Sequence, residues 1–302
     1  MFKSFGKATL GIAAGILMLV GAGTTASADI IVVNTADSGN LSSTTTGGND
    51  SGAIAGYNNT GGEYLVLALT AGSGTNSTSS ALSIPASGID VTFGAQTFTK
   101  VAELGQTVKT FYTSVWILKD PVSGTDDITI NFNANISSGL LPDTTRTAAW
   151  QFGVVSLKNV NETAGANADG VLIVQAIGQT GTTLTNPALN DNDFVLMSET
   201  AGATDIGLPN YVTPTGTAGS TVELYGDNNP TGGGSRGFSV SYAALVGGDI
   251  SGAGDTVVIS ANGITKSSAN RVAVAFDGVV PEPASLVLLA LGGLALLRRK
   301  KM

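Results

Sequence analysis

Carboxylates and amides beside turns are the side chains of this chain with the clearest capacity for chemistry. Asp191 and Asp193 flank Asn192, and Asp227 is followed by two asparagines. Such oxygens are the hard ligands that Ca²⁺ prefers. The same residue types also stabilise turns by hydrogen-bonding to their own backbone, and we favour this interpretation. The sequence therefore predicts no cofactor, with Ca²⁺ at Asp191, Asp193 and Asp227 as the alternative.

Histidine and cysteine are absent from the 302 residues. A Ser/His/Asp triad, a Cys nucleophile, a disulfide and an ordinary zinc site are therefore excluded. A glycosidase needs two carboxylates about 5 to 9.5 Å apart. Asp126 and Asp127 alternate across the start of an expected strand, so they should not converge on one bond. We expect no catalytic residue; a polysaccharide hydrolase or lyase is the less favoured alternative.

The aromatic residues bear on a different alternative, a carbohydrate-binding module that stacks sugar rings on exposed side chains. Trp116 and Trp150 are the two tryptophans, and both lie within strongly apolar segments. Core packing is therefore the favoured interpretation for both. Tyr211 and Tyr225 lie in or beside polar segments and are the better candidates for stacking.

These side chains depend on a body whose apolar residues recur in short or alternating stretches separated by Gly, Pro, Asn and Asp. Ile128, Ile130 and Phe132, for example, alternate with polar residues. We expect an all-β fold, a two-sheet β-sandwich closing one core over residues 63–278. A division near residues 165–170 is the alternative to a single domain. The expected strands are 63–70, 89–93, 96–102, 108–119, 126–133, 148–158, 171–177, 193–200, 220–226, 236–246, 255–260 and 270–277.

Polar segments surround these strands. Residues 29–62 are rich in Ser, Thr, Gly and Asn, so we expect a flexible polar segment there. Asn-X-Ser/Thr sequons also fit exposed loops, among them those at Asn40, Asn58, Asn76, Asn135 and Asn161.

The body resembles a recurrent jelly-roll-type module of bacterial surface proteins. The resemblance covers roughly residues 63–278 and lies in alternation and turns, notably Val91 to Val101, Val115 to Gly124 and Val272 to Phe276. It implies a sandwich fold and no catalytic residue.

The N-terminal residues 1–28 have the layout of a secretory signal peptide. Lys3 and Lys7 precede an apolar run of about 15 residues, and Ala26 and Ala28 supply the small side chains that signal peptidase accepts. We expect cleavage after Ala28. A membrane span needs about 20 apolar residues, so an uncleaved anchor is the less favoured alternative.

The C-terminal residues 279–302 combine three features. Pro281, Glu282 and Pro283 form a tripeptide that cannot be helical, residues 284–297 form an apolar segment with one polar side chain, Ser285, and four cations follow at 298–301. A helix of 14 residues is about 21 Å long, which is marginal for crossing a membrane. The four cations, Arg298, Arg299, Lys300 and Lys301, should stay cytoplasmic and leave the body outside.

This tail resembles the PEP-CTERM sorting signal of bacteria that make exopolysaccharide, since the tripeptide, the apolar helix and the basic cluster occur in that order. The resemblance implies recognition by an exosortase, a membrane-embedded protease, with cleavage near the tripeptide and transfer to the cell surface or the extracellular matrix.

The body between the two cleavage points carries 21 acidic and eight basic side chains, a net charge of −13. It should repel nucleic acid and anionic lipid. We therefore expect an exported, non-enzymatic surface or matrix protein, held briefly in the inner membrane, whose partners are signal peptidase, an exosortase and exopolysaccharide.

Overall fold

The computed structural model describes residues 30–39, 41–43, 51–73, 88–105, 111–132, 148–165, 167, 169–176, 183–185, 194–201, 210–212, 220–227, 240–247, 256–260 and 269–279. Every named element among them is a β-strand. Asp29–Gly278 forms one compact unit. The all-β prediction is confirmed.

A central antiparallel sheet has the strand order β1-β10-β4-β8-β7, and β2 pairs with a further part of β10. Its strands are β1 (Ile31–Asp37), β2 (Leu41–Ser43), β4 (Tyr64–Ser73), β7 (Thr99–Gly105), β8 (Phe111–Lys119) and β10 (Ala148–Lys158).

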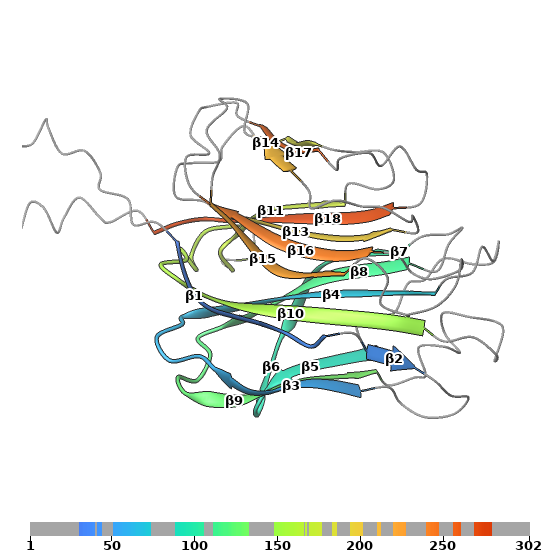
Figure 1. Cartoon of the computed structure of the whole chain (residues 1–302). Coiled ribbons are helices and arrows are strands. Elements are labelled where there is room, and N and C mark those ends of the chain that lie inside the picture. Colours follow the sequence, from blue (N-terminus) through green and yellow to red (C-terminus); the bar gives the residue numbers. More distant parts are fainter. Residues whose placement is uncertain are drawn as a thin grey trace, which may run out of the picture. The chain divides into compact units, whose positions relative to one another are not determined.

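Two further antiparallel sheets pack against the central one (Figure 1). One sheet has the order β3-β9-β5-β6, with β3 (Ser51–Asn58), β5 (Ile89–Phe93), β6 (Gln96–Thr97) and β9 (Thr125–Phe132). The other has the order β11-β18-β13-β16-β15, with β11 (Val171–Ala176), β13 (Phe194–Ala201), β15 (Ser220–Asp227), β16 (Val240–Gly247) and β18 (Ala269–Phe276). A small sheet, β12-β17-β14, comprises β12 (Thr183–Thr185), β14 (Asn210–Val212) and β17 (Thr256–Ser260).

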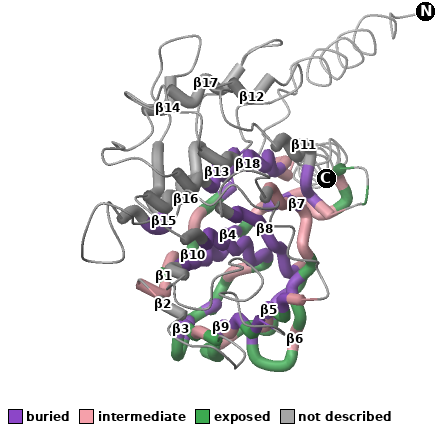
Figure 2. The backbone as a smooth tube through the Cα atoms, turned by 90° about the vertical axis from the view of Figure 1, so that its right-hand side faces the viewer, coloured by how far each residue is buried: buried purple, intermediate pink, exposed green. Residues whose placement is uncertain are grey.

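The sandwich prediction is confirmed, but the body has two cores where we expected one, because the central sheet is covered on both faces. On β4, Leu65, Leu67 and Leu69 belong to the core shared with β3-β9-β5-β6. Tyr64 and Val66, on the opposite face, belong to the core shared with β11-β18-β13-β16-β15. Figure 2 shows the buried residues concentrated on β4, β8 and β10. Burial on both faces explains why β4 is a continuous apolar run, whereas a half-buried strand alternates.

All twelve expected strands have counterparts among the described strands; expected strand 96–102 is divided between β6 and β7. Within the segment 29–62 that we expected to be flexible, however, the described residues form β1, β2 and β3, so that expectation was wrong for these strands. Ile54 and Tyr57 of β3 are both buried in a core. A register shift between Ile54 and Tyr57 breaks the period of two, so the sequence does not alternate although both side chains point inward.

Gly153 of β10 gives Tyr225 of β15 the room to pack against the central sheet. A Cβ at position 153 would lie 2.6 Å from Cδ1 of Tyr225, so one of the two strands would have to shift. We predict that Gly153→Ala lowers the free energy of unfolding by about 1–3 kcal/mol through overpacking, measured by urea unfolding. Ala53→Ser, at an exposed position of β3, should change it by less than about 0.5 kcal/mol. Equal stability of Gly153→Ala and the wild type would contradict this packing.

Candidate functional site

The two ends of the folded body lie at one corner, beside the end of β10. Ile31 of β1 pairs with Lys158, and Gly278, which follows β18, forms a bridge with Val160. Ile30 and Gly278 are both buried. Folded structure therefore begins two residues after Ala28, the expected signal-cleavage residue, and continues to within three residues of Pro281.

The exit of the chain is held by a set of contacts that we name the clasp: Val160, Asn161 and Gly170 on the β10–β11 connection, with Asp277 and Gly278 after β18. The backbone N–H of Asn161 donates to the carbonyl of Asp277 at 2.9 Å, and the N–H of Asp277 donates to the carbonyl of Gly170 at 3.1 Å. The Nδ2 of Asn161 donates to Oδ2 of Asp277 at 2.7 Å. Both backbone groups of Asp277 and one of its carboxylate oxygens are thus bound to this connection.

The glycine of the clasp is required by its backbone conformation and by its surroundings. Gly170 has φ +74°, in the left-handed region that favours glycine, and a Cβ there would lie 2.8 Å from Cγ1 of Val160. A side chain at position 170 would therefore push apart the residues that receive Asp277.

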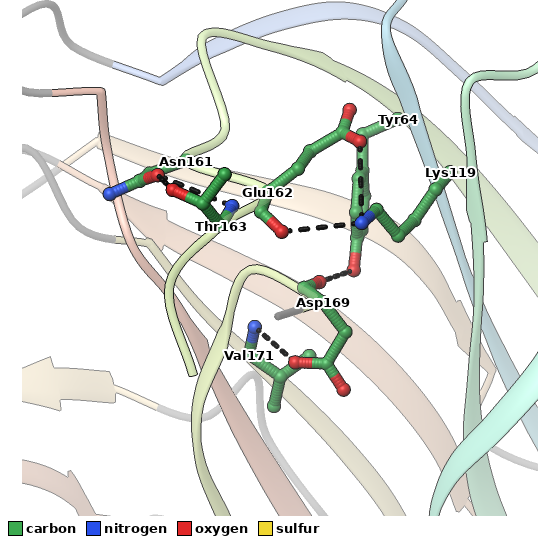
Figure 3. Close-up of polar contacts among 7 residues, drawn as sticks. All are labelled: Tyr64, Lys119, Asn161, Glu162, Thr163, Asp169 and Val171. Carbon is green, nitrogen blue, oxygen red and sulfur yellow. Dashed lines mark hydrogen bonds and ion pairs between the residues drawn. The ribbon is translucent and has the colours of Figure 1, made fainter. Parts of the chain in front are cut away.

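Figure 3 shows how the connection is fixed to the central sheet. The phenol of Tyr64 on β4 donates to the carbonyl of Asp169. The Nζ of Lys119 on β8 donates to the carbonyl of Glu162 at 3.2 Å and lies 3.7 Å from its carboxylate. Asn161 Oδ1 accepts from the N–H and hydroxyl of Thr163 at 3.3 and 2.8 Å. The β10–β11 connection is therefore bound to the central sheet through Tyr64 and Lys119, and a local turn orients Asn161.

Two groups at this corner, Tyr64 and Glu162, have raised pKa values. Burial raises the pKa of Tyr64 well above its ordinary value, and the negative charges of Asp169 and Glu162 raise it further. The phenol therefore stays protonated and can donate. Burial and the carboxylate of Asp120 raise the pKa of Glu162, while Lys119 opposes the rise. These groups bind and orient the chain, and the corner is suited to holding it in place.

A concave feature away from the clasp lies where β5, β6 and β9 meet. It is a shallow pocket of about 150 Å³ lined by Phe93, Ala95, Gln96, Val122, Ser123, Gly124, Thr125 and Asp126. Asp126 lines it, but Asp127 is not part of the lining; Oδ1 of Asp127 accepts the N–H of Gly56 at 2.8 Å instead. The two carboxylates therefore have different surroundings.

Three of the four aromatic candidates, Trp116, Trp150 and Tyr225, are buried. Trp116 and Trp150 are 3% and 2% exposed, which confirms that they pack in the core. Tyr225 is also buried, and its phenol donates to Oγ1 of Thr70 at 3.3 Å. The prediction that Tyr225 could stack on a sugar ring was wrong, because β15 turns this side chain onto β10. The side chain of Tyr211 lies outside the described residues.

The predicted ligands and processing residues fall largely outside the described part of the chain. Asp191 and Asp193 lie outside it, and Asp227 ends β15 with its side chain undescribed. Within the described ranges, no three His, Cys, Asp or Glu side chains gather to hold a metal ion. The remaining predicted residues outside the described part are Ala26, Ala28, Pro281, Glu282, Pro283, Arg298, Arg299, Lys300 and Lys301.

The predicted membrane helix 284–297 also lies outside the described residues. Among the residues that are described, no helix has the length and apolar character needed to cross a membrane.

No local sequence pattern predicted the clasp. The sequence indicated Asn161 only as a sequon on an exposed loop, whereas the side chain is partly buried and its amide donates to Asp277. In the sequence, Asp277 and Gly278 come directly after an apolar strand. They indicate where the strand ends, but not which residues bind the chain there.

Comparison with known proteins bears on the C-terminal segment. Residues 279–301 match the PEP-CTERM protein-sorting motif. Comparisons with curated proteins and with solved structures gave no significant match. The motif implies processing by an exosortase-like membrane protease and a transient membrane anchor. The chain is thus an exported protein with a PEP-CTERM sorting signal at its C-terminus, as expected of an exosortase substrate.

Proposed function

We propose that the released body is a non-enzymatic protein of the cell surface or extracellular matrix that associates with exopolysaccharide. The observation that carries the proposal is the sorting motif at residues 279–301 on a chain without His or Cys. Signal peptidase removes residues 1–28. The basic residues 298–301 keep the C-terminus cytoplasmic, so the body is on the periplasmic side until cleavage.

The outward face of the β3-β9-β5-β6 sheet supports association with a neutral, hydroxyl-rich polymer. Thr92 and Thr129 lie opposite each other on β5 and β9, and their hydroxyls are 2.7 Å apart. Asn131 lies opposite Asp90 in the next outward-facing row. Figure 2 shows exposed residues concentrated on this sheet. Hydroxyl and amide groups on an exposed face can exchange hydrogen bonds with water for hydrogen bonds with sugar hydroxyls.

The test is co-sedimentation of the processed protein with exopolysaccharide from the producing cells. We expect retention that persists in about 0.5 M salt, because at that ionic strength the Debye length is under about 8 Å and charge attraction is screened. The size distribution of the polymer should stay unchanged. Thr92→Val with Thr129→Val should weaken retention, with Thr99→Val, at an exposed position of β7 in the central sheet, as the control. Depolymerisation would indicate the hydrolase or lyase alternative, and no retention would contradict the matrix role.

The burial of Tyr225 also bears on the alternative that the body is a carbohydrate-binding module. Because Tyr225 is buried in the second core, Tyr225→Ala would report on packing and not on stacking against a ligand.

A further inference from the structure

We propose that the clasp controls how fast the protease reaches the sorting tripeptide, so that Asn161 and Asp277 are positioning residues for processing. The inference rests on the proposed processing at the sorting signal and adds a regulating element within the folded body.

The first step is the length of chain between Gly278 and the tripeptide. Val279 and Val280 alone separate Gly278 from Pro281. A residue spans at most about 3.6 Å, so Pro281 is within about 11 Å of Gly278 along the chain. A protease that acts near the tripeptide must therefore work close to residues that belong to the folded body.

The second step is that these residues are already bound. Gly278 is buried and bridges to Val160. Asp277 uses its N–H, its carbonyl and a carboxylate oxygen in the clasp. Proteins that bind extended peptides do so through main-chain hydrogen bonds. The N–H of Asp277 cannot donate to the carbonyl of Gly170 and to an enzyme at once.

The third step fixes how far the chain can be released. Phe276, directly before Asp277, is fully buried, and its ring packs edge-on against Tyr64 with centroids 5.9 Å apart. Opening beyond Asp277 would expose this ring. Opening of the clasp alone releases Asp277 and Gly278, which adds two residues to the chain between the folded body and the tripeptide.

Processing should therefore follow the fraction of molecules with the clasp open. When opening is fast relative to cleavage, the rate is proportional to that fraction. Removing the bond between the Asn161 amide and the Asp277 carboxylate should raise the open fraction about tenfold, the usual scale for a hydrogen bond to a charged group.

The experiment is a pulse-chase of the full-length chain in its producing cells, with conversion to the processed form followed by mass. Asn161→Ala and Asp277→Ala should each shorten the conversion half-time about tenfold. Asp277→Asn, whose side-chain oxygen can still accept but carries no charge, should shorten it less, by about threefold. Ser38→Ala is the control, since it also removes two hydrogen bonds, to the carbonyl of Gly39 and from the N–H of Phe152, which lies eight residues before Val160.

A spacer separates this mechanism from a general loss of stability. Insertion of Gly-Ser-Gly-Ser between Val279 and Val280 supplies free chain without opening the clasp. The insertion alone should speed conversion, and Asn161→Ala should then add nothing. Acceleration by Ser38→Ala equal to that by Asn161→Ala would overturn the inference, as would unchanged half-times in both the Asn161→Ala and the insertion variants. Cleavage that persists after both prolines of the tripeptide are replaced would instead refute the proposed processing.

Discussion

Replacing Pro281 and Pro283 together by alanine should abolish processing and leave the full-length chain in the membrane fraction. Each proline fixes φ near −65° and disfavours a helical conformation in the residue before it. With alanine at both positions, the helical propensity of the apolar segment can extend through Glu282 toward Val280. A protease that reads an extended tripeptide would then find a helix at the sorting motif of residues 279–301.

Immunoblots of the membrane, periplasmic and extracellular fractions measure this effect. The matched controls are Pro85→Ala and Pro187→Ala, which remove prolines outside the motif and should leave processing intact. Release of a shortened double variant into the medium at the wild-type rate would show that the prolines do not define the signal.

The processed protein should unfold cooperatively as the pH rises from 10 to 12. Burial raises the pKa of Tyr57 to about 12, although its bonds to Ser156 oppose the rise. Burial also raises the pKa values of Tyr64 and Tyr112, beyond that of Tyr57. In the unfolded chain all three phenols ionise near pH 10. Because the folded state holds these protons longer, their contribution to stability is complete below pH 10 and is lost as the pH rises above it.

The slope of the free energy of unfolding against pH follows from the number of phenol protons that the chain releases on unfolding. One proton corresponds to about 1.4 kcal/mol per pH unit, so three give about 4 kcal/mol per pH unit, which removes a typical stability of 5–15 kcal/mol within a few units. Urea unfolding monitored by tryptophan fluorescence at a series of pH values measures it. Tyr57→Phe should reduce the slope by about a third. A free energy of unfolding that is constant from pH 9 to 12 would contradict the burial of these phenols.

The strands of the body were predictable because their apolar patterns are local. The alternation of Ile128, Ile130 and Phe132 appears in the structure as one buried face of β9. The continuous run of β4 predicted a strand but not the layer on its second face, because two-sided burial depends on residues more than a hundred positions later in the chain. β3 was missed because its bulge places Ile54 and Tyr57 on one face at a spacing of three.

Pairings between distant segments explain the other differences. Tyr225 has polar neighbours in sequence, and its burial depends on the space that Gly153 leaves on β10. The clasp joins Asn161 to Asp277, which are 116 positions apart, so no local pattern could place them together. The sorting signal, by contrast, is contiguous, and its three parts can be read in order from residues 281–301.

Mass spectrometry of both ends of the mature protein in each cell fraction is the most direct test of export and sorting. The extracellular form should begin at Asp29 and end between Val280 and Pro283, and chains that retain Lys301 should be confined to the membrane. Extracellular protein that still carries Lys301, or folded full-length chain in the cytosol with Met1 and Lys301 both present, would contradict sorting through the C-terminal signal.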